Sequence, residues 1–152
     1  MFKVNDYVIY SSIGVCKIVD IRKEKDINSN EIEHYILQPV YSNKMTIKTP
    51  VDNHKVAMRK VITKDEVEAL IESMPEMETI WIDDYRQRIE SFKAALKTGE
   101  CREWIKLIKT IYLEKKEKSA VGKKLMKSDE DIMKAAEKLL YEEFAVVLNI
   151  SP

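Results

Sequence analysis

The residues of this chain that could support covalent or acid–base chemistry are few. Its only histidines are His34 and His54, and its only cysteines are Cys16 and Cys101. Cys16 and His34 could meet across neighbouring strands, as a Cys/His nucleophile requires. The cysteines match no metal-binding or redox spacing, and three glycines are too few for a phosphate-binding loop. We therefore expect no metal, no cofactor and no enzyme activity, with catalysis by Cys16 or by acid pairs as an alternative.

A different chemistry, contact with nucleic acid, is indicated by the segment Trp81-Ile-Asp-Asp-Tyr85-Arg86. An exposed aromatic beside Arg86 and Arg88 could wedge into a distorted minor groove or stack on an unpaired base. Because Trp81 stands four residues before Tyr85, it could instead continue a buried helical stripe. The acids between them, Asp83 and Asp84, are interpreted as charge near a helix N-terminus, where they complement the helix dipole.

The zero net charge of the chain conceals segments of opposite sign. Residues 86–127 contain thirteen Lys or Arg against five acids, whereas residues 64–85 contain one Lys against eight acids. The basic excess is a solvated helical face or a surface for a polyanion. The loop from Lys118 to Lys124 combines lysines with small residues, so its backbone could approach phosphates closely. The residues predicted to bind DNA are Trp81, Tyr85, Arg86, Lys123, Lys124 and Lys127.

The elements that must position these residues are predicted strands before Val61 and predicted helices after it. Short stretches rich in Val, Ile and Tyr predict strands over residues 7–10, 15–21, 32–37 and 45–49, with a fifth candidate at 56–58. Gly14 is the expected turn position that needs a permissive backbone. Strands of this length and spacing are typical of a small, strongly bent antiparallel sheet or barrel.

From Thr63 onward the apolar residues recur with a helical period. Thr63-Lys-Asp-Glu66 predicts a capping box for a helix that Pro75 closes. Further helices are expected over residues 80–97 and 100–118, and from a cap at Ser128. Tyr85 is placed on the buried stripe of the second helix, and Trp104 in the core. The predicted fold is α+β, with a Tudor/SH3-like β module at residues 1–62 and a helical domain of about four or five helices at 63–152.

Three segments in a fixed order match a known family. They are Phe2-Lys-Val-Asn-Asp-Tyr-Val-Ile-Tyr10 with Gly14, Met45-Thr-Ile-Lys-Thr-Pro50, and Trp81-x-x-x-Tyr85-Arg86. Together with the helical tail they resemble the CarD/CdnL family of bacterial transcription regulators over essentially the full chain. The N-terminal part is also similar to the polymerase-interacting module of transcription-repair coupling factors.

The resemblance implies a β module that binds the RNA polymerase β subunit and a helical module that contacts promoter DNA. It further implies that Trp81 is a wedge at the upstream edge of the transcription bubble, which stabilises the open complex, with Arg86 as a neighbouring DNA contact. Lys48 matches a basic polymerase-contacting position. An exposed edge strand can also extend a partner's sheet through main-chain bonds. The predicted polymerase-binding residues are Met45, Thr46, Ile47, Lys48 and Thr49.

Four acids depart from the family pattern. Asp83 and Asp84 stand where basic residues are usual, and Glu24 and Glu130 fall near expected basic positions. We expect them to weaken direct polymerase or phosphate contact, or to shift phosphate contact to the lysines at 123, 124 and 127.

The remaining expectations concern location and alternative functions. No apolar run approaches the roughly 18 residues of a membrane span, and the early acids argue against a signal peptide. We expect a cytoplasmic, nucleoid-associated protein with no small-molecule substrate. One alternative is a small-barrel protein that binds RNA or a ribosomal partner and uses its helices as a spacer. Another is an interaction protein whose helices mediate oligomers.

Overall fold

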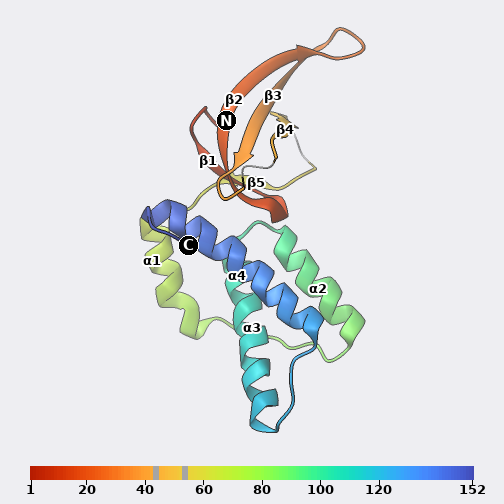
Figure 1. Cartoon of the computed structure of the whole chain (residues 1–152), viewed down its shortest axis with the longest axis vertical. Coiled ribbons are helices and arrows are strands. Elements are labelled where there is room, and N and C mark those ends of the chain that lie inside the picture. Colours follow the sequence, from red (N-terminus) through yellow and green to blue (C-terminus); the bar gives the residue numbers. More distant parts are fainter. Residues whose placement is uncertain (43–44, 53–54) are drawn as a thin grey trace.

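The structure is a computed structural model that describes residues 1–42, 45–52 and 55–152. An antiparallel sheet occupies one end of the long axis and a group of helices the other (Figure 1). The described residues form five strands followed by four α-helices, which confirms the predicted α+β fold. None of the helices formed by these residues is long and apolar enough to span a membrane.

The sheet has the strand order β4-β3-β2-β1-β5, with antiparallel pairing throughout. Its strands are β1 (Tyr7–Tyr10), β2 (Gly14–Lys25), β3 (Glu31–Pro39), β4 (Ile47–Pro50) and β5 (Met58–Lys60). The hairpin of β2 and β3 is longer than predicted because their ladder continues to Lys25 and Glu31. β5 starts at Met58, opposite Tyr10, rather than at residue 56.

Two features bend the sheet onto the helices. The register of β2 against β3 shifts between Ile18 and Asp20, and such a bulge increases local twist. Gly14 adopts a φ of 97°, and a Cβ there would lie 3.1 Å from Leu139 Cδ2. Glycine therefore allows the start of β2 to approach the last helix closely.

The hydrophobic core connects the sheet to the helices. Successive strand residues face opposite sides, so Val8 and Ile9, both fully buried, belong to different clusters. Val8 packs within the sheet, together with Cys16 and Leu37. Ile9 and Val15 instead join the cluster that contains the buried Trp104 and most helical core residues. The sheet and the helices thus share one continuous region of packing.

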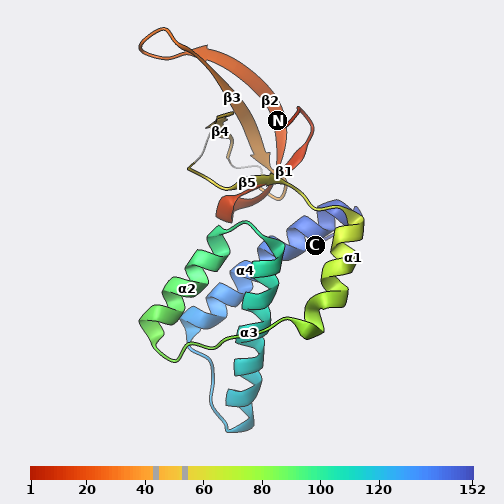
Figure 2. The same ribbon diagram turned by 180° about the vertical axis from the view of Figure 1, so that it is seen from behind.

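The helices are α1 (Lys64–Ser73), α2 (Tyr85–Lys97), α3 (Cys101–Ala120) and α4 (Lys127–Leu148). The capping box of α1 is confirmed, since Thr63 Oγ1 accepts from Glu66 N at 3.2 Å and Thr63 N donates to Glu66 Oε1 at 3.3 Å. Figure 2 shows from behind how α1 and α3 descend on the same side of α4.

Two predicted helix starts are wrong. α2 begins at Tyr85 rather than at residue 80, because Asp84 caps it by accepting from Gln87 N at 3.2 Å. Tyr85 is then 47% exposed rather than part of the buried stripe. α4 begins at Lys127, before the predicted cap at Ser128, and the following Asp129 is directed into the protein.

Candidate nucleic-acid interface and edge strand

Trp81 lies in an extended segment between the short 3-10 helix η2 (Met74–Glu76) and α2, and it is half-buried. Its ring centroid is 6.0 Å from that of Phe92, with the ring planes at 57°. Arg88 Cζ lies 4.5 Å and Lys118 Nζ 5.8 Å from the centroid of the Trp81 ring. Both distances suit cation–π attraction. The indole is thus held in place by core and cation contacts while part of it faces solvent.

Arg88 fixes the backbone that presents Trp81. Its Nε and Nη2 donate to the Asp129 carboxylate at 3.0 and 3.1 Å, and Nη1 donates to the carbonyls of Ile82 and Asp83 at 3.1 and 3.2 Å. Such two-point contacts between arginine and carboxylate define geometry as well as energy. Arg88 is only 4% exposed, so it supports Trp81 from inside the protein rather than lying beside it at the surface.

The other predicted DNA-binding residues lie on segments that meet near Trp81. Figures 1 and 2 agree that the start of α2 lies beside the start of α4, which the loop 121–126 precedes. Tyr85, Arg86, Lys123, Lys124 and Lys127 are all exposed. Lys123 and Lys124 line a depression of about 370 Å³. The arrangement can offer an aromatic face to a base and lysines to phosphates.

Two of the acids near this surface have partners. Asp84 caps α2, as expected of charge at a helix N-terminus. Glu130 Oε1 lies 3.8 Å from Lys115 Nζ. Sequence reasoning missed three exposed apolar residues, Ile80, Val121 and Met126. Ile80 lies in the segment before α2, and Val121 and Met126 lie in the loop between α3 and α4. They are therefore not part of any helical pattern of apolar residues.

The second candidate surface is the edge strand β4. Its place at the end of the strand order confirms the predicted edge for Ile47, Lys48 and Thr49, whereas Met45 and Thr46 are exposed residues that precede the strand. Thr49 is buried at 1% exposure.

Lys48 on this strand is exposed and forms an ion pair with Glu24 of β2. The hydrogen bond from Lys48 lowers the pKa of Glu24. Glu24, an acid near a position where the family resemblance implies a basic residue, therefore pairs directly with Lys48.

The candidate nucleophile does not assemble. Cys16 is opposite Pro39 and His34 is opposite Arg22, five positions apart along β3. At about 3.3 Å per residue this separates them by roughly 16 Å. Burial also raises the pKa of the Cys16 thiol to about 11. His54 lies outside the described residues, and those that are described hold no cluster of His, Cys, Asp or Glu suited to a metal ion.

Sequence reasoning also missed a polar joint between sheet and helices. Arg59 of β5 donates through Nη1 and Nη2 to the Glu143 carboxylate of α4, both at 2.7 Å. Glu143 is fully buried and also accepts from Ile62 N at 2.9 Å and Cys101 Sγ at 3.0 Å. Arg59 Nε donates to Gly99 O at 2.7 Å. One carboxylate thus joins β5, α3, α4 and the segment that leads to α1.

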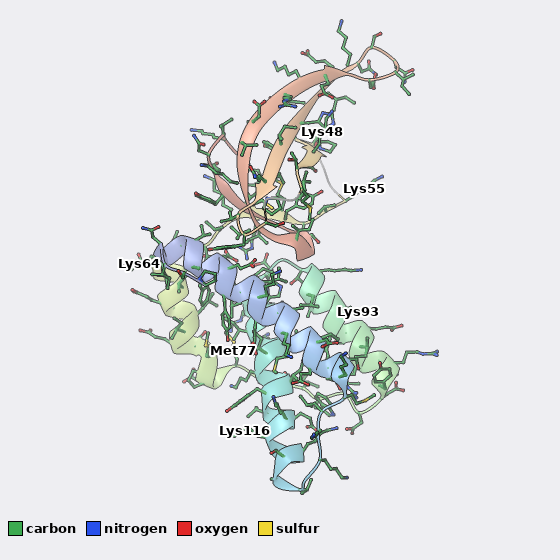
Figure 3. The ribbon with its side chains drawn as sticks, in the orientation of Figure 1. Lys48, Lys55, Lys64, Met77, Lys93 and Lys116 are labelled. Atoms are coloured by element: carbon green, nitrogen blue, oxygen red, sulfur yellow. The ribbon has the colours of Figure 1, made fainter. Side chains whose placement is uncertain are left out.

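The two candidate surfaces lie at different ends of the molecule (Figure 3). Figure 3 shows Lys48 at the sheet end of the molecule and Lys116 near the distal end of α3. Lys118, one of the cations at the Trp81 ring, lies in the last turn of the same helix. A partner on β4 and a partner at Trp81 would therefore approach from opposite ends.

The N-terminal module has a recognisable family. Residues 2–62 match the family model described as the CarD-like/TRCF RID domain. None of the curated proteins matches the chain. The match confirms the resemblance for the β module, which has the Tudor-like fold of that domain, and it points to interaction with RNA polymerase.

Proposed function

We propose, from the premise that residues 2–62 belong to the CarD-like/TRCF RID domain family, that this protein is a non-enzymatic transcription regulator. It binds the RNA polymerase β subunit through β4 and contacts promoter DNA at the upstream edge of the bubble through Trp81. The main support for the DNA role is the constrained, partly exposed Trp81 ring among exposed basic residues.

The wedge role follows from how Trp81 is held. Unstacking a base step costs a few kcal/mol, so an inserted side chain acts best where melting has begun. Because Phe92 and Arg88 already order the indole, little conformational entropy is lost when it meets DNA. Lys123, Lys124 and Lys127 add salt-sensitive phosphate contacts that do not depend on sequence.

The polymerase role uses the edge of the sheet. A strand of a partner can pair with β4 through main-chain hydrogen bonds, and flanking side chains then determine specificity. Lys48 supplies a positive charge beside that edge. Glu24 competes for this charge, so an acidic group on the polymerase must replace Glu24 as the partner of Lys48.

We predict that Trp81→Ala shortens the lifetime of the open complex about fivefold or more, because stacking on one base contributes about 1–3 kcal/mol. Affinity for polymerase should not change. Open-complex decay on a promoter limited by melting measures the first quantity, and binding to the isolated β-subunit lobe the second. Trp81→Phe, which keeps an aromatic ring against Phe92, should retain part of the effect. An unchanged lifetime in Trp81→Ala would remove Trp81 from the DNA interface.

We predict that Lys48→Glu weakens binding to the β-subunit lobe by about tenfold, since it places two like charges beside the edge strand. Glu24→Gln should strengthen binding, because Lys48 no longer has an internal partner. Lys64→Glu, an equal charge change at the start of α1, serves as the matched control. Titration calorimetry distinguishes the variants. Wild-type affinity in Lys48→Glu would exclude Lys48 from the site.

A further inference from the structure

An apolar groove lies between η2, α3 and α4 and shares no lining residue with the Trp81 surface. Its volume is about 560 Å³. The lining includes Met74, Pro75, Ile108, Tyr112, Leu113 and Tyr141.

The side chains of this groove remain exposed although they are large and apolar. Tyr112 is 50%, Leu113 41% and Tyr141 50% exposed. In a chain with 34% charged residues, a contiguous apolar recess of this kind is typical of an interaction site. Neither the proposed DNA contact nor the proposed polymerase contact uses it.

The groove is also preformed. Lys109 Nζ donates to the carbonyls of Met74, Pro75 and Met77 at 2.9, 3.0 and 2.8 Å. These three bonds use all the protons of the ammonium group. Lys109 therefore ties the wall of the groove formed by η2 to α3, and its donors are already occupied.

Acidic residues lie at two edges of the groove. Glu76 directly follows Pro75 in the wall formed by η2. On α4, Glu137 lies one turn before Tyr141. Burial and the charge of Glu137 both raise the pKa of the Tyr141 phenol. The basic groups are Lys109, whose donors are occupied, and Lys116, whose Nζ lies 5.5 Å from the Tyr112 ring centroid.

We propose that this groove binds an amphipathic helix of a protein partner whose apolar stripe is flanked by Lys or Arg. Helices that dock in grooves use apolar anchors at positions i, i+3 or i+4, and i+7. Glu76 and Glu137 would face the basic flanks and favour that charge pattern over its reverse.

A second copy of the chain fits the groove less well. A twofold interface brings the same surface of both copies together, so the acidic edges would face each other. The described helices also bury their own apolar stripes in the shared core, as Phe92, Ile111 and Ala136 show.

The experiment measures binding of two fluorescein-labelled helical peptides to the full chain by anisotropy at low salt. Both peptides, of about 16 residues, carry leucines at i, i+3, i+7 and i+10. One has lysines on both flanks of the stripe, and the other has glutamates at the same positions. We expect the basic peptide to bind at least about tenfold more tightly than the acidic one. Leu113→Ser should weaken its binding about tenfold without altering the circular dichroism spectrum.

Charge reversal tests the two acidic edges. In Glu76→Lys/Glu137→Lys the preference should shift to the acidic peptide, whereas Glu31→Lys/Glu90→Lys, with the same change in net charge, should keep the wild-type order. Equal affinity for both peptides, or wild-type affinity in Leu113→Ser, would overturn the proposal. So would a concentration-dependent dimer in sedimentation that Leu113→Ser abolishes, because the groove would then be occupied by a second copy.

Discussion

Glu143→Ala is expected to lower the free energy of unfolding by about 3–5 kcal/mol, the usual loss when one partner of a buried ion pair is removed. The substitution leaves Arg59 without its carboxylate, and the Ile62 amide and Cys101 thiol without their acceptor. Urea unfolding followed by circular dichroism measures the change. Glu117→Ala, at an exposed position of α3, should lie within about 0.5 kcal/mol of the wild type.

A double substitution distinguishes loss of the pair from loss of packing. In Arg59→Met/Glu143→Met both charges are absent, so much of the stability should return, as in other buried pairs replaced by apolar residues. If Glu143→Ala were as stable as the control, the joint would not hold the sheet to the helices.

Asp129→Ala should destabilise the protein by a similar amount, about 3–5 kcal/mol, because the buried guanidinium of Arg88 loses its two-point partner. The change should also reach Trp81, since Arg88 lies 4.5 Å from its ring centroid and binds the carbonyls that follow it. We expect the tryptophan emission to shift to longer wavelength as the indole becomes more exposed.

Two comparisons make this result specific. The shift should disappear in a Trp81→Phe background, because Trp104 is fully buried elsewhere in the core. Asp131→Ala, at an exposed position two residues further along α4, should change neither stability nor emission. A wild-type spectrum in Asp129→Ala would show that Arg88 does not position the Trp81 segment.

Features encoded by neighbouring residues could be predicted from the sequence. Short stretches rich in Val, Ile and Tyr predicted the positions of β1, β2, β3 and β4 to within a few residues. Thr63 and Glu66 predicted the capping box, because both partners lie within one helical turn. The order of short motifs indicated the domain family that residues 2–62 match.

Features that depend on distant residues could not be predicted. Arg88 and Asp129 are 41 positions apart, and Arg59 and Glu143 are 84 apart. In the sequence these four residues look like any other surface charges. The start of α2 was misplaced for a related reason, since the contacts that hold residues 81–84 outside the helix come partly from Arg88.

The sequence by itself thus determined the α+β architecture, the domain family of the β module and the sorting of charge into segments. Hydrophobic periodicity, helix caps and composition depend on neighbouring residues, so they can be recognised in the sequence without knowledge of the fold. Only the tertiary structure decided which charges face solvent and which are buried. It turned Arg88 and Arg59 into internal supports, left Arg86 and the lysines of the 121–126 loop exposed, and held Trp81 between the core and solvent. The reason is physical: a charge enters the interior only where a partner from a distant segment meets it.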